Sequence, residues 1–478
     1  MPKVQLPIAN GFYVSDSLPI SAQECTNWYP NVVQGVGLSQ ETLFGTDGVV
    51  QLASSGEIEQ QNRGAHVMAG KPYFVNGKRL YRLDETSEGY ELVTLGVVDG
   101  SDRVSMADNG TQLLVLSPES KGYVYNVLTD TYVMITDSDF YINGTPSAVV
   151  FIDGYFLLTT FSRKFIVSAI NDGLSYNALD FGTAESDPDN IVAPVVFKNQ
   201  LFIAGSQTFE AFQNIGGEDF PFQRTGLFLQ KGCYAANSLI NAQDTFMWVG
   251  GGENEGPAIW ALEGNSTVKV STTAIDSLLN NLTEDEIKDI FAWSYASKGA
   301  YFIGFALPST TLVYDTTSKR WHERKSILND TLGVLRVSSI VKAYNKILCG
   351  DIIDGRIGEL SPDVYTEYGS AIVRRVATQP FQNNMESAFF PSLELTVESG
   401  VGNDAVEDPQ ITLERSKDGK TWSAPIARSI GKVGEYTRRA IWRRNGRASR
   451  FEVFRFTLTD AVKPVIIQLT ANIIGGDK

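Results

Sequence analysis

The chain has 478 residues, of which 43% are hydrophobic and 20% are charged, a balance typical of a folded globular protein rather than a disordered one. Its formal net charge of −15 argues against a general nucleic-acid coat, because binding to phosphates requires a basic surface. This length exceeds one ordinary hydrophobic core, which indicates either two or three domains or a repeat fold.

Membrane, metal and redox sites have little support in the sequence. The N-terminus has no apolar core of signal-peptide length, and no segment approaches the roughly 20 apolar residues of a membrane helix. We therefore expect a soluble protein made in the cytoplasm, without a membrane span. The three cysteines (Cys25, Cys233 and Cys349) are far apart, and we expect them to be buried as small apolar residues. With only two histidines, His66 and His322, a histidine-rich metal site is nearly excluded, and we expect no metal and no cofactor.

A hairpin pattern repeats along most of the chain. A β-rich run meets a turn and a second β-rich run follows, as in PYFVNGKRLYRL and AVVFIDGYFLLTT, where Asn-Gly and Asp-Gly are strong turn signals. The turns fall near residues 76, 109, 153, 198, 243, 298 and 345, at intervals of 33, 44, 45, 45, 55 and 47 residues. This spacing predicts a β-propeller of about seven blades. Because the units do not visibly match in sequence, a set of unrelated meanders is the alternative.

One segment, STTAIDSLLNNLTEDEIKDIFAW, predicts a helical insertion over about residues 272–291. Its first apolar residues recur three or four positions apart: Ile275, Leu278, Leu279 and Leu282. Thr283 and Glu286 then form a capping-box pattern that starts a second helix. Such an insertion either contacts a partner or caps an edge of the β structure. Further on, LVYDTTSKRWHER predicts strand, turn and strand, with a packed Trp321 and an ordinary hydrogen-bonded His322.

After about residue 362 the repeat ends and six β-rich segments follow. They predict a C-terminal β-sandwich-like domain over residues 363–478, with the propeller-like domain over residues 1–362. In LELTVE, residues Leu393, Leu395 and Val397 share one face. The stretch SKDGKTW is similar to a shortened Asp box, and the favoured interpretation is a turn with Asp418 and Gly419 at its tip.

Catalytic motifs are not apparent. No G-x-S-x-G, H-E-x-x-H or P-loop pattern occurs. Glycoside hydrolysis needs two carboxylates at a fixed separation, and no such pair stands out among the 55 acidic residues. We therefore expect no catalytic residues.

The stretch YTRRAIWRRNGRASRFEVFRF, residues 436–456, concentrates positive charge in an acidic chain. It holds one glutamate and seven arginines: Arg438, Arg439, Arg443, Arg444, Arg447, Arg450 and Arg455. With a charge of +6 in this window, the remainder of the chain carries −21. If TRRAIWRRN is a strand, arginine lies on both faces, and Arg438 and Arg444 flank a Trp442 ring that a guanidinium can cover.

Three roles are open to these arginines. Arginine used without lysine suggests forked pairing with carboxylates. We favour pairing across a subunit or interdomain interface. The next alternative is a network of ion pairs within one domain (an internal lattice), and the least favoured is direct contact with DNA. The seven arginines are therefore candidate subunit or adaptor interface residues.

Several segments, taken in order, resemble one protein family. They are NWYPN, RVSMADNG, GGEDFPFQRTGLFLQKGC, STTAIDSLLNNLTEDEI, LVYDTTSKRWHER and GEYTRRAIWRRNGRASRFEVFRFTLTDAVKPVI. Together they resemble the packaged-DNA stabilisation proteins of short-tailed bacteriophages, also called tail hub or nozzle proteins. The resemblance covers nearly the whole chain.

The resemblance implies a virion structural protein of the tail, made in the host cytoplasm, with a propeller-like body and added β modules. It implies a homohexameric ring beneath the portal-adaptor ring, which holds packaged DNA with a needle or plug protein, carries tailspikes or fibres and forms the conduit for genome ejection. DNA would pass without sequence-specific binding, along acidic side chains. Two alternatives are a receptor-binding or glycan-processing tail component and a DNA-binding packaging factor.

Overall fold

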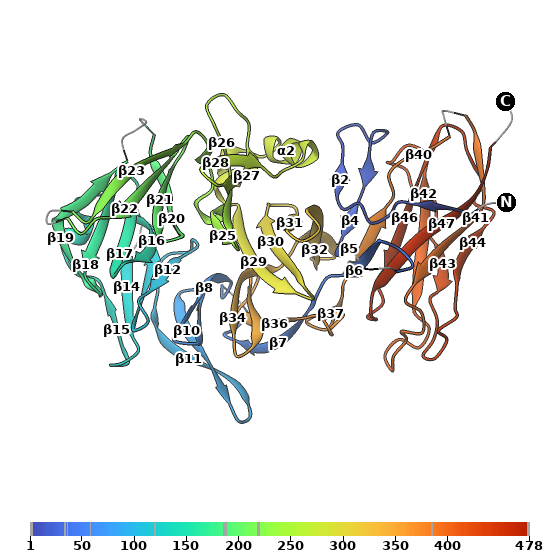
Figure 1. Cartoon of the computed structure of the whole chain (residues 1–478). Coiled ribbons are helices and arrows are strands. Elements are labelled where there is room, and N and C mark those ends of the chain that lie inside the picture. Colours follow the sequence, from blue (N-terminus) through green and yellow to red (C-terminus); the bar gives the residue numbers. More distant parts are fainter. Residues whose placement is uncertain are drawn as a thin grey trace.

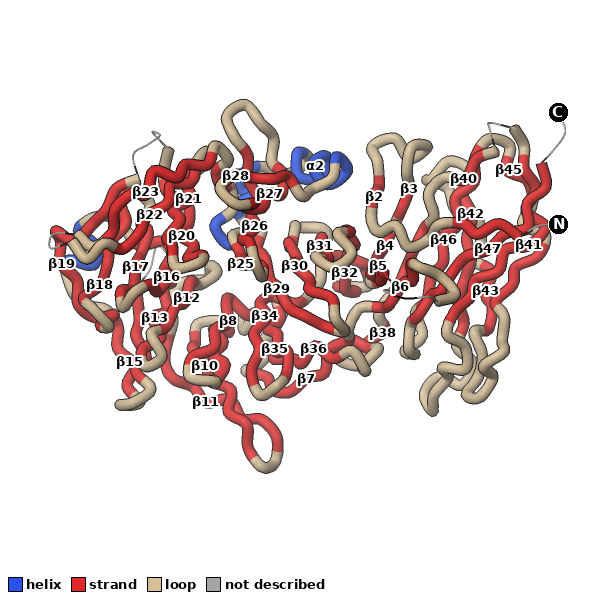
Figure 2. The backbone as a smooth tube through the Cα atoms, in the orientation of Figure 1, coloured by secondary structure: helices blue, strands red, loops and turns tan. Residues whose placement is uncertain are grey.

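Seven small antiparallel sheets fan around a common axis in the computed structural model, and a two-sheet sandwich lies beside them (Figure 1). The structure describes residues 3–475, apart from residues 33–34, 36, 58, 119–120, 185–188, 218–219 and 384–385. Most of the backbone is in strands, and the helices are short (Figure 2). The predicted all-β fold, a β-propeller-like body with a C-terminal sandwich, is confirmed.

The first four sheets, or blades, each contain four strands in sequence order. Blade 1 contains β8 (Asn62–Met68), β9 (Lys71–Asn76), β10 (Arg79–Thr86) and β11 (Gly89–Val97). Blade 2 contains β12 (Ser105–Asp108), β13 (Gln112–Ser117), β14 (Lys121–Asn126) and β15 (Thr131–Met134). Blade 3 contains β16 (Pro146–Ile152), β17 (Tyr155–Thr160), β18 (Lys164–Ala169) and β19 (Asp172–Thr183), with the short helix α1 (Asp139–Ile142) before it. Blade 4 contains β20 (Ile191–Phe197), β21 (Gln200–Gly205), β22 (Phe209–Asn214) and β23 (Phe222–Leu229).

The remaining blades carry additions to this plan. Blade 5 contains β24 (Gly232–Cys233), the 3₁₀ turn η1 (Ala236–Ser238), β25 (Ile240–Ala242), β26 (Thr245–Gly251), β27 (Ala258–Glu263) and β28 (Ser266–Lys269). Blade 6 contains β29 (Phe291–Ser297), β30 (Ala300–Ala306), β31 (Thr311–Asp315) and β32 (Arg320–Leu328), and β33 (Thr331–Val334) extends it. Blade 7 contains β34 (Val337–Ala343), β35 (Lys346–Asp351), β36 (Arg356–Ser361) and the N-terminal strand β7 (Gly48–Ser54), followed by the small hairpin of β37 (Thr366–Glu367) and β38 (Ser370–Ala371).

The uneven intervals between predicted turns have two structural causes. Five of the turns join the first two strands of a blade, and the turn near residue 243 joins β25 to β26 of blade 5. The turn near residue 76 joins the second and third strands of blade 1. The equivalent turn in blade 1 is Ala69-Gly70, with φ of 51° and 76°. The 55-residue interval contains the helical insertion, α2 (Thr273–Asn280) and α3 (Glu284–Lys288). The predicted capping box at Thr283 is present in α3.

Each blade is covered by its neighbours, as a propeller requires, because one small sheet cannot bury both of its faces. Leu116 of blade 2 and Phe156 of blade 3 share one buried cluster. Phe74 of blade 1 and Leu348 of blade 7 share another, which closes the circle. All three cysteines are free and buried, as predicted, and burial raises the pKa of Cys233 to about 12.

The circle is closed by strands from the two ends of the propeller sequence. β7 pairs antiparallel with β36, with Val49 opposite Leu360 and Ser54 opposite Arg356. The seventh blade therefore contains a strand that precedes the first blade in the chain, and this pairing leaves no local signal in the sequence.

The sandwich has two sheets, and both recruit strands from the N-terminus. One sheet contains β1 (Lys3–Leu6), β5 (Trp28–Val32), β6 (Glu41–Gly45), β41 (Ala388–Val397), β44 (Ala440–Arg443), β45 (Arg447–Ala448) and β47 (Val465–Gly475). The other contains β4 (Cys25–Thr26), β39 (Arg374–Ala377), β40 (Phe381–Gln382), β42 (Gln410–Ser416), β43 (Ile426–Ser429) and β46 (Phe451–Leu458). A separate hairpin of β2 (Tyr13–Val14) and β3 (Ala22–Gln23) lies beside α2, where Ser277 donates to Asp16.

The propeller and the sandwich share one hydrogen-bonded sheet. β4 pairs with β32 of blade 6 on one side and with β39 of the sandwich on the other, so that eleven strands are continuous. The predicted division at residues 362/363 stays a prediction. N-terminal strands within residues 3–45 nevertheless belong to the sandwich sheets, because β1 and β6 pair with β47 and β5 pairs with β6. The two parts are therefore joined by backbone pairing as well as by side chains.

Candidate subunit interface on the sandwich

The arginine-rich stretch lies on the outer edge of the sandwich, at the end of the molecule remote from the propeller (Figure 1). β44 is the edge strand of its sheet, with Arg443 opposite Ser392 of β41. In β45, Arg447 lies opposite Phe389. The strand β44 covers only residues 440–443, so the predicted longer strand TRRAIWRRN is wrong at both ends. Its N-terminal part, residues 437–439, forms a turn and a loop.

Six of the seven arginines are exposed, and the side chains of five of these six form no ion pair within the described part of the chain. We call this set the arginine edge: Arg438, Arg443, Arg444, Arg447 and Arg450. Arg447 lies 5.8 Å from the centre of the Phe389 ring. Arg444 has a φ of 59°, at the turn that follows β44. Five exposed guanidinium groups on one edge concentrate positive charge there, with donors suited to carboxylates or phosphates.

The other two arginines pair within the subunit. Arg439 makes a two-pronged contact with Glu394 of β41, at 2.6 and 2.7 Å, and Lys3 binds the same carboxylate. Hydrogen bonds from Arg439 and then Lys3 lower the pKa of Glu394 to about 2, although burial opposes this shift. Arg455 is half-buried in β46 and makes a two-pronged contact with Glu414, at 3.0 Å for each nitrogen.

The predicted cover of Trp442 by a guanidinium is wrong. The Trp442 ring is 1% exposed and packs edge-on against Phe456, while its indole N–H donates to the carbonyl of Ile426. Among the described residues, the arginine stacked on a tryptophan in this domain is Arg455, 3.8 Å from the centre of the Trp422 ring. Trp442 points into the sandwich core because alternation along β44 places it on the same face as Ala440.

Apolar side chains accompany the arginine edge, and the sequence analysis missed them. They are Phe389, Ile426, Val433 and Tyr436, which are 41%, 44%, 67% and 74% exposed. Arg428, also missed, donates from Nε to the carbonyl of Ile441 and so covers part of the free edge of β44. Exposed aromatic rings beside arginines are the composition that protein interfaces favour. The signal available in the sequence was the loop IGKVGEY, in which Gly431 and Gly434 adopt positive φ.

The Asp-box-like stretch is a turn, as predicted. Asp418 accepts hydrogen bonds from the backbone N–H groups of Lys420 and Thr421, and these bonds lower the pKa of its carboxyl. Gly419 has a φ of 76° and its amide donates to Ser416. The Asp418 carboxylate is therefore engaged in holding the turn.

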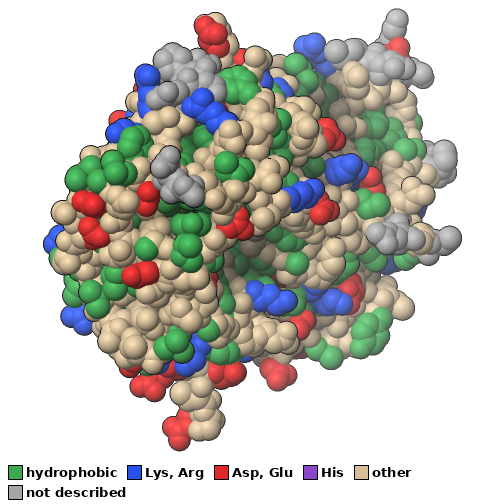
Figure 3. All heavy atoms as spheres, turned by 60° about the vertical axis from the view of Figure 1, so that its left-hand side comes forward, with side chains coloured by type: hydrophobic (Ala, Val, Ile, Leu, Met, Phe, Trp, Pro, Cys, Tyr) green, Lys and Arg blue, Asp and Glu red, His purple; other side chains and the backbone are tan. Residues whose placement is uncertain are grey.

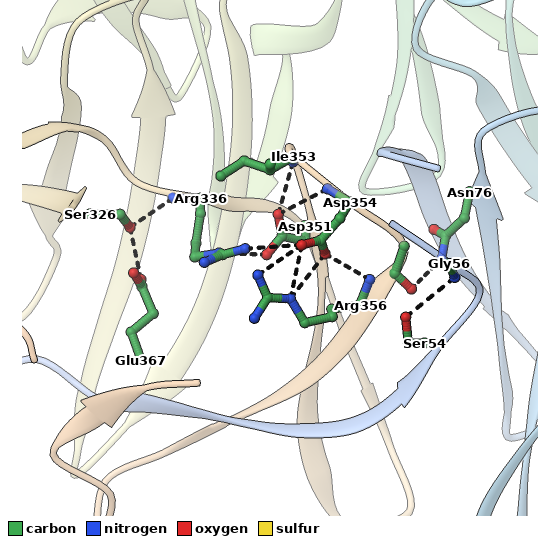
Figure 4. Close-up of polar contacts among 11 residues, drawn as sticks. Ser54, Gly56, Asn76, Ser326, Arg336, Asp351, Ile353, Asp354, Arg356 and Glu367 are labelled. Carbon is green, nitrogen blue, oxygen red and sulfur yellow. Dashed lines mark hydrogen bonds and ion pairs between the residues drawn. The ribbon is translucent and has the colours of Figure 1, made fainter. Parts of the chain in front are cut away.

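A buried cluster of charged groups stabilises the closing blade (Figure 4). Arg336 donates to Asp351 at 2.6 Å, and Arg356 makes a two-pronged contact with Asp354. Beside them, Glu367 accepts from Ser326 at 2.8 Å. Burial raises the pKa of Glu367 to about 7, with nearby Arg336 opposing this shift. The two aspartates are paired with guanidinium groups, as in a structural network.

A central cavity of about 1210 Å³ lies where the innermost strands of the blades meet. Its polar wall groups bridge neighbouring elements: His66 Nε2 lies 2.6 Å from Asp108 Oδ2, and Arg103 donates to Ser338 while its guanidinium lies 4.0 Å from the centre of the Phe291 ring. Within the described residues, no group of three or more His, Cys, Asp or Glu side chains is arranged to hold a metal ion. None of the helices described in the structure has the length and apolar character needed to cross a membrane.

Comparisons with known proteins agree with this architecture. The family model described as "Bacteriophage P22 Gp10, beta-propeller" matches residues 4–365, and the model described as "Bacteriophage P22 Gp10, beta-sandwich" matches residues 374–474. The curated "Tail hub protein gp10" of Salmonella phage P22 is 23% identical to this chain over 280 residues. That alignment covers 57% of this chain and 58% of the relative, less than two thirds of the relative's length.

Solved structures show more distant similarity. The WD40 β-propeller domain of Doa1 is 12% identical, with a TM-score of 0.41 over 65% of this chain and 97% of that chain. YCF48 from Cyanidioschyzon merolae is 12% identical, with a TM-score of 0.43 over 66% of this chain and 99% of that chain.

Proposed function

The chain belongs to the bacteriophage P22 Gp10 family, and on that premise we propose that it is a structural protein of the phage tail hub. In this role it assembles as a ring beneath the portal-adaptor ring, retains packaged DNA and forms the conduit through which the genome leaves. The observation that carries the proposal is the family match, which covers both the propeller and the sandwich in their order along the chain.

The sheet shared by the propeller and the sandwich supports a structural rather than a catalytic role. The propeller and the sandwich share a continuous sheet through β4, and in blade 7 Arg336 pairs with Asp351 while Arg356 pairs with Asp354. A subunit that bears the pressure of packaged DNA benefits from parts that cannot hinge freely. The acidic remainder of the chain suits a conduit, because acidic walls repel DNA and favour passage over retention by binding.

The arginine edge supports assembly with other virion proteins. Its five arginines form no ion pair within the described part of the subunit, and exposed apolar side chains accompany them. We propose that Arg438, Arg443, Arg444, Arg447 and Arg450 form a contact between subunits or with the adaptor ring. Arg439 and Arg455, which were also candidates, are assigned to the internal lattice because their carboxylate partners lie in the same subunit.

The further partners follow from the proposed position in the tail. We propose a hexameric ring that meets the adaptor above, a needle or plug protein within the channel, and tailspikes or fibres outside. The alternative, a receptor-binding or glycan-processing tail component, needs a concave site with free paired acids and stacked aromatic rings. In the central cavity, Asp108 contacts His66 and the Phe291 ring is covered by Arg103, which gives this alternative little support.

The test is a stop codon at Trp28 in the parent phage, with the DNA in each particle quantified under non-permissive conditions. We expect heads that fill with DNA, lack tails and then leak. Full, stable particles that fail to adsorb would overturn the proposal in favour of receptor binding. Heads that never fill would overturn it in favour of a packaging factor.

A further inference from the structure

The arginine edge is chemically suited to an anionic partner, and the propeller of a second copy carries an acidic projection. We propose that the arginine edge of one subunit docks on the acidic β10–β11 hairpin of the neighbouring subunit. This contact rests on the ring assembly proposed above and names the surfaces that form it.

The β10–β11 hairpin combines charge with projection. Its residues 84–91 contain four acids and no lysine or arginine. Glu85, Glu88 and Glu91 are exposed, and within the described part of the chain Glu88 and Glu91 form no ion pair. The hairpin extends beyond blade 1 at the lower side of the molecule, and acidic side chains gather on that lower rim (Figures 1 and 3). Because β11 is the outer strand of its blade, the hairpin is reachable by another molecule.

Exposed apolar groups lie at the base of the hairpin, at the other end of β11 from the acids of its turn, and also along the arginine edge. Near the base of the hairpin, Val97 is 54% exposed, and the Tyr132 hydroxyl donates to its carbonyl, which places β15 against the end of β11. Neighbouring apolar residues of blade 2 are also exposed: Leu128, Val133 and Met134. The arginine edge carries Phe389, Val433 and Tyr436 in the same way. Contact along the length of the hairpin would pair charges near its tip and bury apolar groups at its base, so that the interface would combine both kinds of contact.

A second acidic projection, at α3, fits this role less well. Its Glu286 is held in the capping box with Thr283, and its Asp285 pairs with Lys288 at 3.0 Å. Two of its acids are therefore engaged within the subunit. Its Glu284 and Asp289 are exposed and form no ion pair among the described residues, but Lys288 lies between them and offsets their charge. Residues 84–91 of the β10–β11 hairpin contain no basic residue, so charge complementarity favours the hairpin.

The geometry favours contact between copies. The hairpin belongs to the propeller and the arginine edge lies at the far end of the sandwich, so the two surfaces of one chain are well separated (Figures 1 and 2). Two different surfaces that meet head to tail generate a ring when the rotation closes. Because Arg428 already donates to the carbonyl of Ile441 on β44, the contact is made by side chains rather than by addition of a strand.

The test is a cross-link within assembled particles. A phage that carries Arg447→Cys together with Glu88→Cys is treated with a short bismaleimide and the products are separated under denaturing conditions. We expect a ladder of linked multiples, because each subunit joins the next. The background is low, since the three native cysteines are buried. The matched control is Arg447→Cys with Asp285→Cys, which places the second thiol on α3 at a similarly exposed acid.

The outcomes separate this inference from the function on which it rests. A ladder with Glu88→Cys and none with Asp285→Cys supports the docking. Normal particles that give a ladder only with Asp285→Cys, or with neither pair, overturn the hairpin as the partner and leave the tail hub intact. Particles that are complete and stable without the protein overturn the proposed function itself. A second experiment reverses the charges. Changing Glu85, Glu88 and Glu91 to Lys should lower the infectious titre by at least about tenfold, and adding Arg443→Glu and Arg447→Glu to the same chain should restore it. A titre that is not restored would also count against the docking.

Discussion

Asn27 and Lys325 form a reciprocal pair of hydrogen bonds that joins the N-terminal segment to blade 6. The Asn27 side-chain amide donates to the Lys325 carbonyl at 2.9 Å, and the Lys325 backbone N–H donates to the Asn27 side-chain oxygen at 3.0 Å. The same amide also donates to the carbonyl of Val373, at 2.8 Å. One buried side chain with a φ of 56° therefore connects the propeller, the N-terminal segment and the strand that leads into the sandwich.

Asn27→Asp should destabilise this junction. Aspartate tolerates the left-handed backbone about as well as asparagine, so the backbone is not strained. The amide donor is replaced by a carboxylate oxygen that faces two carbonyl oxygens, and a negative charge is buried. We expect a loss of at least roughly 3 kcal/mol, measured by urea denaturation. The control is Asn31→Asp, whose amide makes only a long contact of 3.4 Å with Thr42. Equal losses in the two variants would contradict the role assigned to Asn27.

Arg63→Lys should loosen blades 1 and 2. The Arg63 side chain is buried and donates to the carbonyls of Gly77, Val98, Asp99 and Asp102 and to the Ser117 hydroxyl. A lysine carries three donors on one nitrogen and cannot reach this spread of acceptors. We expect a loss of roughly 3 kcal/mol in thermal or urea unfolding. Arg79→Lys, at an exposed position of the same blade, serves as the control, and a change as large there would argue against a specific clamp.

Glu367→Gln should stabilise the protein at high pH. The pKa of this carboxyl is raised to about 7 from an ordinary value of 4.5, because burial disfavours its charge. The folded protein therefore binds a proton more tightly than the unfolded chain, so this group lowers stability as pH rises from about 4.5 to 7, after which its effect is constant. The full effect is roughly 3 kcal/mol.

The measurement for Glu367 is the melting temperature from pH 5 to pH 8. We expect the melting temperature of Glu367→Gln to rise progressively relative to that of the parent chain as the pH increases over this window. Glu359→Gln removes a carboxylate from β36 of the same sheet, where it is half-buried and paired with Lys346 at 2.5 Å, and serves as the control. A gain that is the same at pH 5 and pH 8 would contradict the assignment.

Arg455→Ala and Arg450→Ala should separate stability from assembly. Removal of Arg455 leaves the half-buried Glu414 without its two-pronged partner and uncovers Trp422, so we expect a loss of roughly 2–3 kcal/mol in urea unfolding of the isolated subunit. Arg450 is exposed and forms no ion pair within the described part of the chain, so its removal should leave unfolding unchanged. Incorporation into tails should fall for Arg450→Ala. If the Arg455→Ala subunit kept the unfolding stability of the parent, the stabilising role assigned to the Arg455–Glu414 pair would be contradicted.

Local features were predictable from the sequence, and long-range pairings were not. The turns at Asp153, Lys298 and Asn345 adopt the positive φ that their hairpins require, and the capping box at Thr283 forms as its spacing predicts. The pairing of β7 with β36 joins residues about 300 positions apart, so periodicity within a short window cannot reveal it. The same applies to the N-terminal strands of the sandwich, which pair with β47 and β39.

The candidate site shows the same limit. Alternation in LELTVE placed Leu393 and Leu395 in the core, where they are 0% and 1% exposed. The role of each arginine depended on which acids the fold brings near it, and that is set by strand register. Arg455 lies opposite Glu414 across a strand pair, whereas Arg450 lies at a turn, and nothing in the sequence around them distinguishes the two.

The most direct test of the account is complementation of the Trp28 stop phage with a chain in which Arg443, Arg444, Arg447 and Arg450 are all changed to Glu. The melting temperature of this variant is first matched to that of the parent subunit, so that folding is controlled. The account predicts heads that fill with DNA and then leak, without tails, as with the stop codon alone. Particles that retain their DNA and infect at the parental level would contradict it.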